Sequence, residues 1–154
     1  MRRKDREITD PNNIGNFIAK EQILRIAFYD DGDIYIVPIN YGYSHDEQCT
    51  FYFHGAKAGR KYELAKKTPA VGFEIDGDYT LLTGETACDF SAAFQSVVGT
   101  GTLSIVENTE EKIKGLNAIM KQTTSKAEWD YSNEMLEAVA VFRLDVDKMS
   151  CKAK

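Results

Sequence analysis

The sequence predicts a mainly β protein, a small β-barrel with helices at its periphery. Six or seven segments with strand-like alternation or β-branched and aromatic residues follow one another at close spacing. Helices are expected near the start, in the middle and late in the chain. Because the chain has 154 residues and neither an internal repeat nor a low-complexity tract, we expect one domain over residues 1–154.

The composition argues against several classes of protein. Hydrophobic residues make up 43% and charged residues 28%, as in an ordinary folded protein rather than a disordered one. The net charge of -5 argues against nucleic-acid binding driven by bulk charge. Since no apolar run approaches about 18 residues and no apolar segment follows the N-terminus, we expect no membrane span, no secretory signal and a cytoplasmic location.

The cysteines and histidines give no signal for a metal. The three cysteines, Cys49, Cys88 and Cys151, form no C-x-x-C pair, so we expect reduced thiols. His45 lies in a polar loop, where a solvated histidine is the simpler interpretation. His54 directly follows an aromatic strand. Two histidines and three scattered cysteines lack metal-ligand spacing, and we therefore expect no metal.

The first half of the chain predicts a helix followed by three strands. The charged first ten residues are typical of a frayed arm. Asp10 and Pro11 are typical of a helix start, as cap and first helical residue. The expected strands are Ile26–Tyr29 and Ile34–Tyr41, which form a hairpin across the turn 30–33, and then Cys49–Phe53. Pro38 inside the second strand cannot donate to a ladder, so that strand should lie at an edge or a bulge.

The second half predicts another hairpin, a long strand, two helices and a closing strand. The hairpin strands are Val71–Ile75 and Tyr79–Thr83, joined by Asp76-Gly77-Asp78. Asn108 and Ser132 are the expected helix caps. The long strand and the last strand are expected over Phe94–Val106 and Ala138–Val146.

The stretch from Phe51 to Ala70 predicts an anion site. It reads as an aromatic strand, a glycine loop and a helix start, with Lys57, Arg60 and Lys61 around Gly59. Open backbone N–H groups at a helix start and nearby cations favour an anion, most simply a phosphate. The loop matches neither G-x-x-x-x-G-K-[ST] nor G-x-G-x-x-G. A solvated basic helix start remains the alternative.

Five segments in order and spacing carry a resemblance to a known family. They are RRKDREITD, IYIVPINYGY, FYFHGAKAGRKYELAKKTPAVGFEID, ACDFSAAFQSVVGTGTLSIVE and DVDKMSCKAK. Together they resemble the flavin-binding split-barrel proteins related to pyridoxamine 5′-phosphate oxidase, in the branch of the nitroimidazole-resistance reductases. The resemblance covers nearly the whole chain.

This resemblance implies a six-stranded FMN-binding split β-barrel with peripheral helices and a tight homodimer that holds FMN at its interface. By the resemblance, Arg60 and Lys61 grip the FMN phosphate. Lys57 and the N–H groups around Ala58 and Gly59 lie alongside. The N-terminal RRKDR segment would pack across the dimer.

The resemblance also implies the residues around the flavin ring. Val37, Pro38, Ile39 and Asn40 would present backbone groups to the edge of the isoalloxazine ring. Ser96 and Val97 lie where the long strand would pass the flavin. His54 matches a histidine that this branch carries near the flavin, where it is the candidate catalytic residue. A histidine that merely closes the strand end is the alternative. Cys88 matches a family cysteine, although burial of a small side chain is its simpler interpretation; Trp129 could cover a partner's flavin, although a place in the core is the simpler one.

These observations lead to three functional hypotheses. The first is an FMN-dependent reductase of small, electron-poor, nitroimidazole-like molecules, with NAD(P)H or a protein as electron donor. The second is an FMN-binding or redox-sensing module without turnover. The third is oxidation of pyridoxamine phosphate, which the tail KMSCKAK disfavours because it lacks the R-L-A-P-like ending of those oxidases. Haem binding, known among split-barrel relatives, has only His54 in its support.

Overall fold

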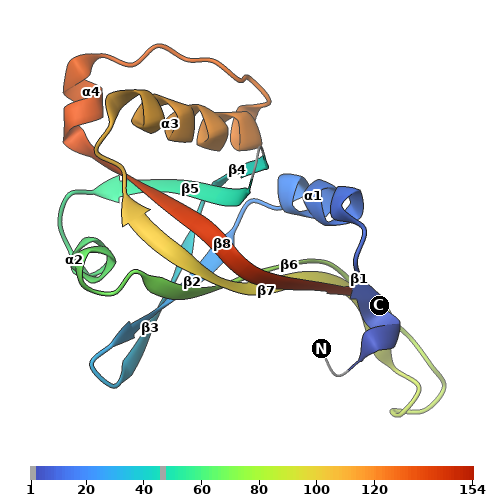
Figure 1. Ribbon diagram of the computed structural model, residues 1–154. Helices are drawn as coiled ribbons and strands as arrows, with labels where there is room; N and C mark the ends of the chain where they lie inside the picture. Colours follow the sequence, from blue (N-terminus) through green and yellow to red (C-terminus); the bar gives the residue numbers. More distant parts are fainter. Residues whose placement is uncertain (1–2, 46–47) are drawn as a thin grey trace.

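A computed structural model describes residues 3–45 and 48–154 (Figure 1). A 3-10 turn, η1 (Lys4–Arg6), opens the described chain. The helices are α1 (Pro11–Lys20), α2 (Arg60–Lys67), α3 (Thr109–Thr124) and α4 (Asn133–Ala138). The strands are β1 (Glu7–Ile8), β2 (Leu24–Asp30), β3 (Asp33–Ile39), β4 (Gly42–His45), β5 (Cys49–Ala56), β6 (Ala70–Leu82), β7 (Ser91–Ile105) and β8 (Val139–Ala153).

The strands form a single antiparallel sheet that does not close. Its order is β3-β2-β6-β7-β8-β5-β4, and β1 adds to β8. In the described chain, β1 and β4 are short, and the other six strands are long enough to build the barrel wall. An open sheet of this kind with four helices around it confirms the predicted split-barrel class. The edges of the sheet are β3 and β4.

The core lies inside the curve of this sheet. Phe28, Phe53, Phe73 and Leu144 come from four different strands and are almost fully buried in one cluster. A second, smaller cluster joins α3 to the other face of β5 and β8 (Figure 1). As a result, α3 covers the outer face of the sheet over β4, β5 and β8.

Three helix caps, one hairpin and the edge position of Pro38 are confirmed. The side chains of Asp10, Asn108 and Ser132 cap α1, α3 and α4, each accepting a hydrogen bond from a first-turn N–H. The β2–β3 hairpin forms as expected. Pro38 lies on the edge strand β3, as a residue without an N–H donor requires.

Three predictions about strands are wrong or too short. The first residues are not a frayed arm, because Glu7 and Ile8 pair with Lys152 and Cys151 of β8. That pairing also explains why β8 runs well beyond Val146. The short strand β4, which pairs with β5, was not predicted.

The predicted turn at Asp76-Gly77-Asp78 is also wrong. β6 passes through these residues without reversing and pairs with β7 on both sides of them. Its register shifts between Gly77 and Thr80, and Asp78 adopts a φ of 55°. The sequence signal is therefore a β-bulge, which uses the same residue types as a turn.

The close approach of α3 to β4 generates a stability prediction. A Cβ on Gly42 would overlap the backbone of Ala118 and Ile119 in α3. We expect Gly42→Ala to lower the free energy of unfolding by about 3 kcal/mol, measured by chemical denaturation. Gly72→Ala is the matched control, because its Cβ would lie 3.8 Å from the nearest atom. Equal stability of the two variants would contradict the packing described for α3.

Candidate functional site

The first turn of α2 is open to an anion. Gly59 is its cap residue, with φ 92° and ψ 172°, a conformation that side-chain-bearing residues rarely adopt. No side chain of the described residues caps this helix. The N–H groups of Arg60, Lys61 and Tyr62 precede the first intrahelical bond, which Glu63 donates to Gly59, and they lie at the positive end of the helix dipole.

Arg60, the first residue of α2, points toward the β2–β3 hairpin. Its Nε and Nη2 atoms each lie 2.8 Å from Oδ2 of Asp30, at the end of β2. Its guanidinium carbon lies 4.6 Å from the ring centroid of Tyr35 on β3. About half of the Arg60 side chain, 48%, remains exposed. The guanidinium is therefore held in place by Asp30 and Tyr35 but keeps donors available to a ligand.

Lys61, the next residue, points toward the other side of the sheet. Its Nζ lies 3.4 Å from the backbone oxygen of His54, and 5.4 and 5.3 Å from the ring centroids of Phe53 and Phe142. Burial lowers the pKa of this ammonium. Partial burial of the imidazole, and then the charge of Lys61, lowers the pKa of His54 from 6.5. Part of the His54 surface nevertheless remains exposed, and the residue lies on β5 beyond those that pair with β4.

The edge strand β3 supplies the third part of the site. Pro38 is exposed, Val37 is half-buried and Ile39 is buried. Asn40 follows the strand, and its Nδ2 donates to the backbone oxygen of Gln22 at 3.1 Å. In the described sheet β3 pairs only with β2, so one side of its backbone is free to bind other groups.

We call these three parts together the seam: the edge strand β3, the exposed end of β5 and the start of α2, which contacts the β2–β3 hairpin through Arg60 and β5 through Lys61 (Figure 1). Nine predicted residues lie along it. They are Val37, Pro38, Ile39, Asn40, His54, Lys57, Gly59, Arg60 and Lys61. Lys57 is exposed in the loop before α2.

Ser96 and Val97 lie on a different strand from these nine residues, two strands from β5 in the sheet order. Both are on β7, three strands from β3 in the sheet order, or about 14 Å at the usual strand spacing. The Val97 side chain is fully buried in the core. Ser96 points to the outer face between Asp76 and Lys152, its paired neighbours. Although Ser96 is only 7% exposed, its hydroxyl has no hydrogen-bond partner among the described residues.

The outer face of β3, β2, β6 and β7 is strongly apolar, which the sequence reading missed. Ile34, Ile36, Tyr29 and Val98 are 63%, 59%, 56% and 49% exposed there. A depression of about 390 Å³ runs over the small residues of this face; Ala27, Gly72 and Thr100 line it. The sequence contains a signal for this face. In a strand, successive side chains point to opposite faces, so apolar residues at both odd and even positions indicate burial on both faces.

Two other predicted residues lie elsewhere. Cys88 is exposed, so its expected burial is wrong. Trp129 is also exposed rather than in the core, with the Lys126 Nζ 4.1 Å from its ring centroid. Among the described residues there is no cluster of three or more metal-ligating side chains. None of the described helices has the length and hydropathy needed to cross a membrane.

Comparison with known proteins places the chain in a family. A family model described as pyridoxamine 5′-phosphate oxidase matches residues 10–153. A search of curated proteins gave no match. A solved structure from Bacteroides thetaiotaomicron, of a protein proposed to act in 5-nitroimidazole antibiotic resistance, is 28% identical, with a TM-score of 0.83 over 96% of this chain and 86% of that one.

Two further structures share the fold at lower identity. The FAD and haem binding protein from Mycobacterium smegmatis has 14% identity and a TM-score of 0.83, over 97% of this chain and 73% of that one. The flavocytochrome Anf3 from Azotobacter vinelandii has 17% identity and a TM-score of 0.81, over 100% of this chain and 72% of that one.

The environment of His54 generates a prediction of pH dependence. Because its folded-state pKa is lowered, the unfolded chain takes up this proton more readily. The free energy of unfolding should therefore fall as the pH drops through about 6.5, and His54→Gln should reduce that fall. NMR titration of the imidazole should give a pKa below 6.5. Lys61→Met should raise the pKa of His54 only part of the way back to 6.5, because burial lowers this pKa more than the charge of Lys61 does. A measured pKa at or above 6.5 in the parent protein would contradict this environment.

Proposed function

The chain belongs to the pyridoxamine 5′-phosphate oxidase family, and from this premise we propose that it binds FMN and reduces small, electron-poor molecules such as nitroimidazoles. The observation that carries the proposal is the start of α2, where free N–H groups, Arg60 and Lys61 meet at the open edge of a split barrel. The Bacteroides relative, at 28% identity, supports the choice of nitro compounds.

The cations of α2 fit the phosphate of FMN. Arg60 can meet phosphate oxygens with the guanidinium donors that Asp30 does not occupy. Lys61 adds a point charge from the next position, and burial strengthens its interaction with an anion. The first-turn N–H groups would complete the phosphate contacts. Asp30 keeps the guanidinium of Arg60 over the ring of Tyr35, so the guanidinium donors are already positioned when the ligand binds.

The edge strand and His54 fit the other end of the cofactor. The backbone around Val37, Pro38, Ile39 and Asn40 is not fully used by the sheet and can hydrogen-bond a flavin ring. FMN, when bound, supplies the electron-transfer chemistry. His54 has a lowered pKa and is mostly neutral near pH 7, so one ring nitrogen can donate a hydrogen bond to the molecule being reduced. Electrons would come from NAD(P)H or from a protein donor.

A second copy of the chain is part of this proposal. Ser96 and Val97 lie on β7, three strands from β3 and two from β5 in the sheet order. In a homodimer packed through the outer face, Ser96 could approach the partner's flavin, and its buried hydroxyl would gain a partner. The exposed apolar side chains of that face favour such burial, since patches of this kind mark interfaces.

An FMN-binding or redox-sensing module without turnover is the second candidate. It is favoured by the small number of titratable groups at the seam, where His54 is the one candidate acid–base side chain among the described residues. Oxidation of pyridoxamine phosphate is less well supported. The tail lacks the expected ending, and it is used to pair β8 with β1 and β7.

The phosphate assignment predicts the effect of Arg60→Ala. Loss of a charge-assisted contact should weaken FMN binding by about 1.5–3 kcal/mol, or about tenfold to a hundredfold. Isothermal titration of the apoprotein with FMN measures this directly. Lys66→Ala, on the last turn of the same helix, is the control and should leave the affinity unchanged. An unchanged affinity in Arg60→Ala removes this residue from the phosphate site.

The reductase proposal predicts rapid electron transfer to a nitro compound. The FMN-loaded protein, reduced anaerobically and mixed with 2-methyl-5-nitroimidazole in a stopped-flow instrument, should reoxidise faster than free reduced FMN. His54→Gln should slow this step by about 100-fold with little change in FMN affinity. Tight FMN binding without faster reoxidation for any electron-poor acceptor would favour the binding module instead.

The proposed homodimer predicts that a charged substitution on the outer face will change the oligomeric state. Light scattering should give the mass of two chains, and Ile36→Lys should yield a monomer, because a charge would be buried at the interface. Met135→Lys is the control, since this equally exposed residue lies on α4, away from that face. A monomeric parent protein refutes the dimer.

A further inference from the structure

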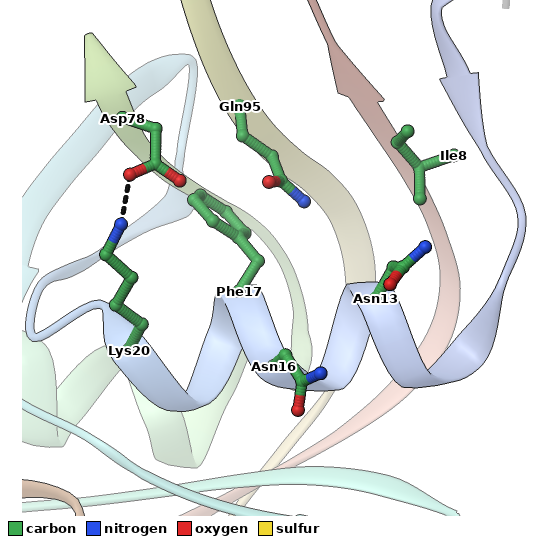
Figure 2. Close-up of a pocket in the computed structure, with 7 residues that line it drawn as sticks. All are labelled: Ile8, Asn13, Asn16, Phe17, Lys20, Asp78 and Gln95. Carbon is green, nitrogen blue, oxygen red and sulfur yellow. Dashed lines mark hydrogen bonds and ion pairs between the residues drawn. The ribbon is translucent and has the colours of Figure 1, made fainter.

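A second pocket lies against α1 (Figure 2), which Figure 1 shows on the other side of the molecule from the β2–β3 hairpin. It has a volume of about 360 Å³, within the range of small-ligand sites. Three segments far apart in the sequence build it: α1, β1 and the region where β6 and β7 pair. None of its lining residues belongs to the seam. The lining residues are Ile8, Asn13, Asn16, Phe17, Lys20, Asp78 and Gln95.

The carboxamide groups of the pocket have unused hydrogen-bonding capacity. Within the described residues, the side chains of Asn13 and Asn16 form no hydrogen bond. Gln95 donates from Nε2 to Sγ of Cys151 at 3.5 Å, and sulfur is a weak acceptor. In Figure 2 the amide of Gln95 points down toward α1, on the side of Asn13. The pocket consequently offers both donors and acceptors to a ligand.

The bulge in β6 shapes one end of this pocket. Asp78, at φ 55° beside the register shift, turns toward α1 and pairs with Lys20 (Figure 2). In a regular strand, side chains would continue to alternate between the two faces here, and Asp78 would not need a positive φ. Bulges are frequently found where a strand must redirect a side chain toward a site. The Lys20–Asp78 pair closes this end and leaves no unpaired cation among the lining residues.

The charges around the pocket disfavour an anionic ligand. The carboxylate of Glu21 packs against Gly77, next to Asp78. Burial, followed by the negative charges of Asp78 and Asp76, raises the pKa of Glu21, whereas Lys20 acts in the opposite sense. Arg25 forms ion pairs with Glu74 and Asp76 on the outer face, so its charge is already balanced there. A second negative charge in this pocket would therefore be repelled.

Ile8 and Phe17 provide the apolar part of the lining, and Figure 2 shows Phe17 between Gln95 and the Lys20–Asp78 pair. We propose that this pocket binds a small, uncharged, planar molecule with a carboxamide or imide edge, which pairs with Gln95 and Asn13 and rests on Ile8 and Phe17. This inference stands independently of the proposed function, because it uses no residue of the seam.

Nicotinamide and nicotinate are matched probes, since they differ only in a carboxamide against a carboxylate. In ¹H–¹⁵N NMR titrations of the full chain, nicotinamide should cause saturable shifts in the amides of α1 and of residues 76–79. Nicotinate should bind about tenfold or more weakly, because it carries the charge that the surrounding carboxylates repel. Shifts confined to α2 and β3 would place the probe at the seam and overturn the proposal.

Variants then test the carboxamide contacts. Gln95→Met keeps the length of the side chain but removes its amide, and it should weaken nicotinamide binding about fivefold, the value of one hydrogen bond. Gln48→Met is the control, because Gln48 bonds to the backbone oxygen of Val146, away from the pocket. If Gln95→Met does not fold, Asn13→Leu on the exposed surface of α1 replaces it. No saturable binding, equal binding of the two probes, or an unchanged affinity in the variant overturns the assignment.

Discussion

The start of α2 connects the two sides of a sheet that does not close, and the candidate site depends on this connection. Arg60 and Lys61 are adjacent in the sequence, but consecutive residues of a helix point about 100° apart. Arg60 therefore reaches Asp30 and Tyr35 beside the edge strand, whereas Lys61 reaches the aromatic rings of β5 and β8. Two neighbouring cations therefore contact both sides of the opening.

The contact between Arg60 and Asp30 also affects how strongly the seam attracts anions. Asp30 offsets part of the positive charge of Arg60, so the net field at the helix start is weaker than the sequence alone suggests. What the carboxylate provides is position, because the guanidinium is held over Tyr35 by a charge-assisted bond at 2.8 Å. A phosphate then meets an ordered donor, which lowers the entropic cost of binding. Lys61 has no carboxylate partner among the described residues, so no side-chain anion offsets its charge, although burial lowers its pKa.

Sequence reasoning succeeded where a local interaction decides the structure. The caps at Asp10 and Asn108 need only the next few residues, and the cationic helix start lies within one turn. It failed at Asp76-Gly77-Asp78, because turn and bulge use the same residues and only the register of β7 distinguishes them. Ser96 and Val97 came from the resemblance alone. No local signal could tell that the sheet order places them three strands from β3.

The two ends of the molecule differ in charge, and this difference separates their ligands. At the seam, the cations Lys57, Arg60 and Lys61 lie around the start of α2, whereas the pocket under α1 is lined by the ion pair of Lys20 and Asp78, with Glu21 nearby. In a chain with a net charge of -5, an anionic group would be attracted to the cations clustered at the start of α2. The electrostatic field of these charges does not attract or repel a neutral molecule, so the binding position of such a molecule depends on hydrogen bonds and apolar contacts. The same fold can therefore hold a charged group and an uncharged one without competition between the sites.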